Sequence, residues 1–178
     1  MPASGLSLIG SRATGKTSVG RLVADRLNWR FVDADHALEE RLGRSIASLF
    51  ADQGEAVFRD EEERTLLSLT QSPPFVLATG GGAVLRPSNR DALRRFGCVV
   101  WLQADPHVLA QRLSENPGNR PSLTGLGLVE EIQSVLKARI PLYRDLADVE
   151  VDTRDRSASQ VADVVLEAFL LWQQERPR

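Results

Sequence analysis

Short runs of apolar residues alternate along the chain with segments whose apolar residues recur at helical spacing. Three of the short runs are too continuously apolar for a sheet with one exposed face, which predicts strands covered by helices on both sides. Strands are expected at 6–9, 31–33, 75–79, 98–103 and 149–151. The alternation favours an α/β fold with a parallel sheet of about five strands.

The helical segments between these strands each carry an apolar stripe on one face. Asp105 and Pro106 supply an N-cap and a first-turn residue for the helix after the fourth strand. Pro141 is expected to end the helix that follows, because proline cannot donate the backbone hydrogen bond of a helix interior. The stripes are Val19, Leu22, Val23 and Leu27; Val108, Leu109 and Leu113; Val129, Ile132, Leu136 and Ile140; and Val161, Val164, Val165, Ala168 and Trp172.

Segment 115–127 interrupts the alternation. It holds two prolines and three glycines between two predicted helices, and it is much longer than the usual connection of about 4–6 residues. A lid over an active site and a plain surface connection both fit such a segment. With no other break along the chain, residues 1–178 are expected to form one domain.

Composition excludes several classes of protein. The net charge of −2 gives no general attraction to nucleic acid or to an anionic membrane. The apolar runs are too short to span a bilayer, and the first twenty residues lack the apolar core of a signal peptide, so we expect a cytoplasmic protein. The single cysteine, Cys98, excludes a disulfide framework and is expected in the core.

Gly10-Ser11-Arg12-Ala13-Thr14-Gly15-Lys16-Thr17 matches the phosphate-loop pattern G-x-x-x-x-G-K-[ST] between a predicted strand and a predicted helix. Only two of the 22 basic residues are lysines, and Lys16 stands where this motif needs one. Its compact charge suits the β- and γ-phosphates, and the Thr17 hydroxyl is a ligand for Mg²⁺. The residues expected to bind ATP here are Ala13, Thr14, Gly15, Lys16, Thr17 and Ser18.

The class of phosphate-loop protein follows by exclusion. The chain has neither the Asn-Lys-x-Asp sequence of a GTPase nor the Leu-Ser-Gly-Gly-Gln sequence of a transporter ATPase. A small-molecule kinase is the simplest remaining member.

Carboxylates follow the second predicted strand. Asp33 and Asp35 lie at its carboxyl end, where the ligand crevice of an open parallel sheet is found. They could serve Mg²⁺ through water and a substrate hydroxyl. Alternatively, Asp35 caps the next helix.

Three further features are ambiguous one by one. Arg59 and Glu62 are one helical turn apart, so the acid could hold the guanidinium, although a solvated charged face has the same pattern. Gly80-Gly81-Gly82 permits close approach to a ligand at the end of the third strand, where a tight turn is the alternative. Arg139 is predicted near the C-terminal end of a helix, where a cation also suits the helix dipole.

Together these motifs resemble those of the shikimate kinase family, over nearly the whole chain from about Leu6 to Phe169. The matching elements, in order, are the phosphate loop, Asp33-x-Asp35, Phe58-Arg59-x-x-Glu62, Gly80-Gly81-Gly82, Arg120-Pro121 and Arg139-x-Pro141-x-Tyr143. The resemblance implies transfer of the γ-phosphoryl group of ATP to the 3-hydroxyl of shikimate, with Mg²⁺, on the pathway to chorismate and the aromatic amino acids.

The resemblance also implies roles for individual residues. Asp35 would bind shikimate hydroxyls, and Arg59 and Arg139 its carboxylate. Arg120, within the lid at 115–127, would close over the transferred phosphate. The remaining assignments are shikimate contacts from Gly80, Gly81 and Gly82, adenine contacts from Arg112 and Arg156, and metal binding by Thr17 and Asp33.

Two other functions compete with this interpretation. A kinase of another carboxylated polyol, such as gluconate, would share the phosphate loop and the fold, but not the combination of Arg59, three glycines and Arg139. A regulatory module that binds ATP without turnover would not need the acceptor residues. We expect ATP and shikimate as partners, with no nucleic acid or membrane, and a monomer.

Overall fold

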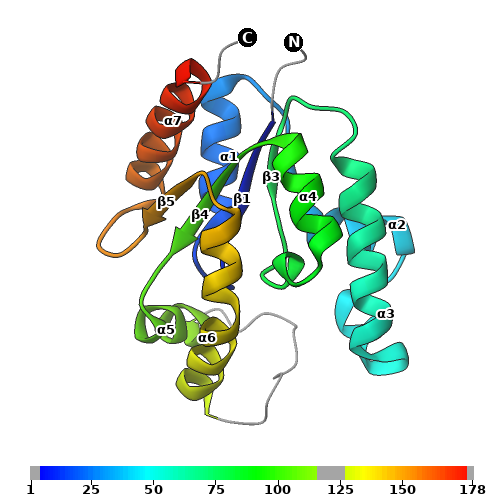
Figure 1. Ribbon diagram of the computed structural model, residues 1–178. Coiled ribbons are helices and arrows are strands. Elements are labelled where there is room, and N and C mark those ends of the chain that lie inside the picture. The colour runs from blue at the N-terminus through cyan, green and yellow to red at the C-terminus, as the bar shows by residue number, and fades with distance from the viewer. Residues whose placement is uncertain (1–4, 116–126, 176–178) are drawn as a thin grey trace.

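A five-stranded parallel sheet with helices on both faces forms the centre of the molecule (Figure 1). The structure is a computed structural model, and it describes residues 5–115 and 127–175. The strand order is β2-β3-β1-β4-β5. The strands are β1 (Gly5–Ile9), β2 (Phe31–Asp33), β3 (Val76–Ala78), β4 (Gly97–Gln103) and β5 (Val149–Asp152). The predicted α/β fold is confirmed, and each predicted strand end lies within one residue of the observed one.

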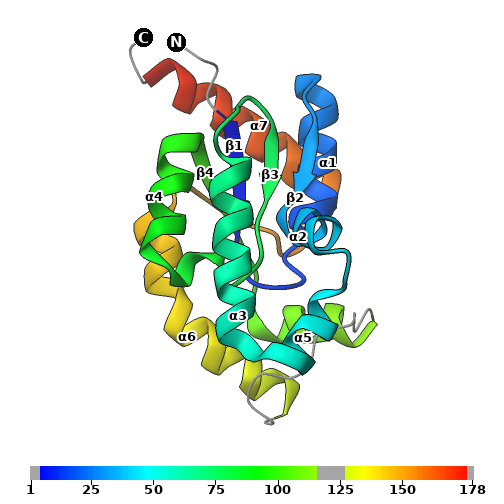
Figure 2. The same ribbon diagram turned by 90° about the vertical axis from the view of Figure 1, so that its right-hand side faces the viewer.

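Alternate residues of β4 face two separate hydrophobic cores. Cys98, Val100 and Leu102 pack with α1 and α7, whereas Val99 and Trp101 pack with α4 and α6. Figures 1 and 2 show these two pairs of helices on opposite faces of the sheet. The helices are α1 (Lys16–Leu27), α2 (Ala34–Leu42), α3 (Ile46–Leu69), α4 (Pro87–Phe96), α5 (Pro106–Glu115), α6 (Leu128–Leu146) and α7 (Ala158–Glu175), with a 3₁₀ turn η1 (Ala83–Leu85).

Helix α6 continues through Pro141, so the prediction that it ends there is wrong. Pro141 leaves the Lys137 carbonyl without its intrahelical donor. The apolar side of the helix nevertheless continues to Tyr143 and Leu146, which are both buried in the core. Burial of these side chains outweighs one lost hydrogen bond. Arg139 therefore lies inside the helix rather than at its end, which removes the helix dipole as an explanation for this residue.

Helices α2 and α3 form a smaller unit beside the β2 edge of the sheet (Figure 2). Its core consists of Leu38, Ile46, Leu49 and Phe58. Gly54 interrupts α3 with a φ of 79°, a left-handed conformation that favours glycine. The second half of α3 begins there and carries Arg59 toward the end of β3. Within the described parts of the chain, no helix has the length and apolar character needed to cross a bilayer.

Candidate active site

The phosphate loop connects β1 to α1 and requires its glycines. Gly10, Ala13 and Gly15 have φ values of 138°, 61° and 92°. A Cβ atom on Gly10 would lie 2.3 Å from the Leu102 carbonyl oxygen, so the loop could not approach β4 this closely with another residue there. Gly15 is the N-cap of α1. The loop thus curls around the N-terminus of this helix, as the motif predicts.

The two side chains that start α1 are held by hydrogen bonds. The Lys16 ammonium donates to the carbonyl oxygens of Gly10, at 2.9 Å, and Ser11, at 2.7 Å, so it lies across the loop. The Thr17 hydroxyl donates to Asp33 Oδ2 at 2.8 Å. Ser18 follows in the first turn and is exposed. The described structure therefore brings the two residues expected at the metal, Thr17 and Asp33, into direct contact.

Asp33, rather than Asp35, caps α2. Its Oδ1 accepts hydrogen bonds from the backbone N–H of Asp35, at 3.1 Å, and of His36, at 3.4 Å. The alternative that explained Asp35 as a helix cap is wrong. The cap falls two residues earlier because α2 begins directly after β2, without a connecting loop.

The three glycines after β3 lie among the charged side chains expected at the acceptor. A Cβ atom on Gly80 would be 2.9 Å from Asp35 Oδ1, and one on Gly82 would be 2.3 Å from Arg59 Nη1. From Gly81, the corresponding distance to Arg139 Nη1 is 3.6 Å. Such a Cβ would also lie 3.4 Å from the Gly10 carbonyl oxygen of the phosphate loop. The structure therefore gathers every described residue of the expected acceptor site beside the phosphate loop.

Two acids hold Arg59. Its Nη1 donates to Glu62 Oε2 at 2.7 Å, and its Nη2 donates to Glu55 Oε1 at 3.0 Å. Glu62 is only 4% exposed, so the alternative of a solvated charged face is wrong for this pair. Sequence reasoning missed Glu55, although its spacing of four residues from Arg59 is a recognisable signal for an ion pair.

Tyr143 belongs to the motif that begins at Arg139, but the sequence analysis assigns it no role in the site. Its hydroxyl donates a hydrogen bond of 2.5 Å to the Gly81 carbonyl oxygen, and the side chain is fully buried. Burial raises the pKa of Tyr143 to about 12, against the opposing effect of the Arg139 guanidinium. The available signal was its position four residues after Arg139, which gives both side chains the same face of α6.

The residues expected at adenine lie toward the other edge of the sheet. Arg112 donates to the Ala13 carbonyl oxygen at 3.2 Å and to the Thr153 carbonyl oxygen at 3.1 Å, which links the phosphate loop to the segment after β5. Arg156 donates to the Asp152 carbonyl oxygen at 3.1 Å and is exposed. Arg120, with residues 116–126 of the expected lid, lies outside the described residues.

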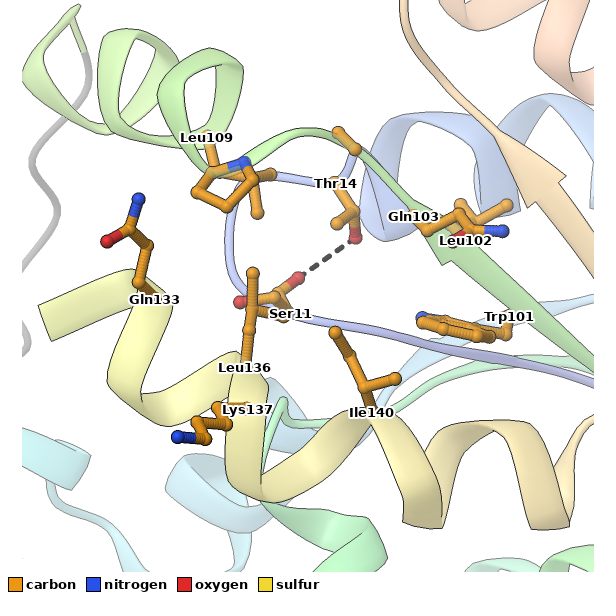
Figure 3. A pocket seen from close by; sticks show the side chains of 12 residues that line it. Ser11, Thr14, Trp101, Leu102, Gln103, Leu109, Gln133, Leu136, Lys137 and Ile140 are labelled. Atoms are coloured by element: carbon orange, nitrogen blue, oxygen red, sulfur yellow. Dashed lines mark hydrogen bonds between the residues drawn. The ribbon is translucent and has the colours of Figure 1, made fainter. Parts of the chain in front are cut away.

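Behind the phosphate loop lies a mainly apolar cavity of about 320 Å³ (Figure 3). It is bounded by the loop, the end of β4, the start of α5 and the middle of α6. In its wall, the Thr14 hydroxyl donates a hydrogen bond of 2.9 Å to the Ser11 carbonyl oxygen. None of the acceptor residues lines this cavity, so it is separate from the cluster around the glycines. The lining residues are Ser11, Thr14, Trp101, Leu102, Gln103, Ala104, Pro106, Leu109, Gln133, Leu136, Lys137 and Ile140.

Comparison with known proteins identifies the family. The family model described as shikimate kinase matches residues 12–170. The chain belongs to the shikimate kinase family. It is 41% identical over 166 residues to a shikimate kinase of Rhodopirellula baltica, covering 92% of this chain and 89% of that protein. It is 44% identical over 161 residues to one of Cupriavidus pinatubonensis, covering 90% and 83%. The predicted ATP-dependent small-molecule kinase, with shikimate kinase activity, is thereby confirmed.

Solved structures agree with this assignment. The shikimate kinase from Acinetobacter baumannii in complex with shikimate matches with a TM-score of 0.90 and 34% identity, covering 98% of this chain and 96% of that chain. A gluconokinase from Sinorhizobium meliloti matches with a TM-score of 0.59 and 18% identity, covering 97% and 98%. That second likeness extends to the fold alone, and the family match favours shikimate over gluconate.

Proposed function

We propose that this protein transfers the γ-phosphoryl group of ATP to the 3-hydroxyl group of shikimate, which gives shikimate 3-phosphate and ADP. The observation that carries the proposal is the convergence of Asp35, Arg59 and Arg139 on the three glycines beside the phosphate loop. Shikimate is a small polyhydroxylated carboxylate, and this cluster offers groups for both its acid and its hydroxyls.

Arg59 and Arg139 bind the shikimate carboxylate. Guanidinium groups match the planar geometry of a carboxylate and form charge-assisted hydrogen bonds with it. Glu55 and Glu62 orient Arg59, so little side-chain entropy is lost when the substrate binds. The backbone of Gly80, Gly81 and Gly82 supports the substrate at close range, because no side chain intervenes.

Asp35 accepts hydrogen bonds from shikimate hydroxyls and orients the one that attacks the phosphate. Phosphoryl transfer passes through a loose transition state, so positioning and charge neutralisation matter more than a strong base. We therefore assign Asp35 to orientation first, and to acceptance of the hydroxyl proton as the new bond to phosphorus forms.

The nucleotide lies along the phosphate loop, with its phosphates bound by the backbone of Ala13–Ser18 and by Lys16. Arg112 and Arg156 flank the adenine. By the same family membership, Arg120 contacts the transferred phosphate once both substrates are bound.

The contact between Thr17 and Asp33 fits Mg²⁺. A hydroxyl and a carboxylate 2.8 Å apart at the start of α1 are oxygen ligands of the kind this ion prefers, with water completing its coordination. When bound, the ion neutralises charge on the β- and γ-phosphates. Thr17 would bind it directly and Asp33 through water.

The decisive experiment measures ADP release with ATP and Mg²⁺ in the presence of shikimate, gluconate or neither. We expect turnover only with shikimate, and loss of most of it in Lys16→Met, since one charge on the transferring phosphate contributes several kcal/mol. Preferred turnover of gluconate would contradict the proposed substrate. ATP binding with no turnover of either compound would favour a regulatory module.

We further propose that residues 1–178 act as a single-domain, cytoplasmic monomer. A single folding transition would support the one-domain arrangement, and a molar mass near 19.6 kDa by light scattering would support the monomer. A mass near twice that value would contradict it.

A further inference from the structure

We propose that Tyr143 is a positioning residue for shikimate, because its hydroxyl fixes the glycine backbone on which the substrate rests. This inference rests on the proposed function. It concerns a residue outside the expected set of substrate contacts, and it is carried by the contacts that the ring and the hydroxyl make.

The Tyr143 hydroxyl acts directly on the middle glycine. It donates to the Gly81 carbonyl oxygen at 2.5 Å, across 62 positions of sequence. A carbonyl has a fixed orientation relative to the N–H of the next residue, because the peptide unit is planar. Holding the Gly81 carbonyl therefore also sets the direction of the Gly82 N–H group. Gly82 belongs to the three glycines expected to contact shikimate, Gly80, Gly81 and Gly82, which we call the glycine platform.

The Tyr143 ring has almost no freedom to move. It is fully buried and stacks on Trp101 of β4, with ring centroids 5.5 Å apart and planes 23° apart. The hydroxyl is thus attached to the sheet by a rigid aromatic pair. A threonine or serine at this position could not reach Gly81 from such an anchor.

Tyr143 is also linked to the two arginines of the site. Arg139 lies one helical turn earlier on α6, and its guanidinium interacts with the Tyr143 hydroxyl. Arg59 is close enough for its charge to act on the same group. Since burial raises the pKa of this hydroxyl to about 12, it remains a protonated donor throughout the working pH range of an enzyme. The hydroxyl is therefore a permanent donor to the Gly81 carbonyl oxygen.

The direct test is Tyr143→Phe, which keeps the ring and removes only the hydroxyl. Leaving the buried Gly81 carbonyl without its hydrogen-bond donor costs free energy in the site. We therefore expect kcat/KM for shikimate to fall about tenfold, while KM for ATP stays within about twofold. The matched control is Ser7→Ala. It removes another fully buried hydroxyl that donates to a backbone carbonyl, that of Cys98 at 3.3 Å, in the middle of β1 rather than among the three glycines.

Both variants should lower the melting temperature, but only Tyr143→Phe should lower kcat/KM for shikimate. Equal kinetic constants for shikimate in Tyr143→Phe and wild type would overturn the role of Tyr143. Wild-type protein that does not phosphorylate shikimate would instead contradict the proposed function, so the two failures are distinguishable.

A second measurement does not depend on the variant folding. Tyr143 is the only tyrosine in the chain, so biosynthetic incorporation of 3-fluorotyrosine gives a single fluorine NMR resonance from this site. We expect saturation with shikimate to shift that resonance more than saturation with ADP and Mg²⁺. A resonance that stays in place, while calorimetry demonstrates shikimate binding, would contradict the inference.

Discussion

Asp33 and Asp35 lie two residues apart, yet they have different surroundings. Asp33 accepts hydrogen bonds from the start of α2 through one carboxylate oxygen and from Thr17 through the other. Asp35 points toward Gly80, with its Oδ1 only 2.9 Å from the position a Cβ atom would take there. Local structure thus accounts for the carboxylate of Asp33, whereas we propose that the carboxylate of Asp35 serves the acceptor site.

This difference makes Asp35→Asn a selective test. The change is nearly isosteric and leaves the Asp33 cap intact, so the melting temperature and ATP binding should hardly change. The kcat/KM for shikimate should fall by at least about a hundredfold, on the order of 3 kcal/mol, from lost positioning and proton acceptance. Thermal melting and steady-state kinetics on the same preparation measure both effects.

Asp33→Asn is the matched control. Asparagine caps a helix about as well as aspartate, so stability should again be retained. The lost charge lies beside Thr17, and the concentration of Mg²⁺ needed for half-maximal rate should rise. If Asp35→Asn phosphorylates shikimate at the normal rate, Asp35 has no role in the acceptor site.

Arg59 and Arg139 give a second test at this scale. A charge-assisted hydrogen bond contributes about 1.5–3 kcal/mol, so Arg59→Ala and Arg139→Ala should each weaken shikimate binding at least tenfold. Calorimetry should find ADP binding near normal in both. Arg94→Ala is the control, because Arg94 forms an ion pair of the same length, 2.7 Å, with Asp145 on the surface and away from the site. Equal damage to ADP binding would mean that the arginines act on the nucleotide instead.

Among the elements, the glycine platform after β3 can be tested by comparing alanine substitutions at two of its positions. A Cβ atom on Gly82 would come within 2.5 Å of three guanidinium atoms of Arg59. The φ of Gly82 is −96°, so alanine fits the backbone and only the end of the Arg59 side chain must move. Gly82→Ala should therefore keep the fold and the affinity for ADP. The affinity for shikimate should fall about tenfold, because Arg59 is displaced.

Gly81→Ala provides the comparison for this test. The Cβ atom added at position 81 would lie 3.4 Å from its nearest neighbour, the Gly10 carbonyl oxygen, which is an ordinary contact distance. The loss of shikimate affinity should be clearly smaller than in Gly82→Ala. Equal losses in the two variants would show that any side chain on the platform blocks the substrate, independently of Arg59.

The elements also differ in how far the sequence predicted them. The strands are short segments that are mainly apolar, and this local pattern located their ends within one residue. The path of α6 beyond Pro141 depends on burial of Tyr143 and Leu146 against distant segments, which no local pattern contains. The contact between Tyr143 and Gly81 joins residues 62 positions apart, so the sequence could suggest the motif but not the hydrogen bond.

At the scale of the whole molecule, the residues proposed to bind the two substrates lie near different strands of the sheet. The phosphate loop follows the central strand β1. The acceptor residues lie toward β2 and β3, whereas Arg112 connects the loop to the segment after β5. All of these groups are at the carboxyl ends of the strands, toward the bottom of Figure 1, where open parallel sheets bind ligands. Both proposed substrate sites therefore lie at the same edge of one sheet.

Each substrate should consequently raise the melting temperature of the entire protein through its own residues. A ligand at about 100 times its dissociation constant adds about 2.7 kcal/mol to the free energy of unfolding. For a domain of this size that corresponds to roughly 5–10 °C. Shikimate should produce such a rise in wild type and little at the same concentration in Arg59→Ala, whereas ADP with Mg²⁺ should stabilise both. Gluconate is the control for recognition, and a rise equal to that of shikimate would contradict an acceptor site built for shikimate.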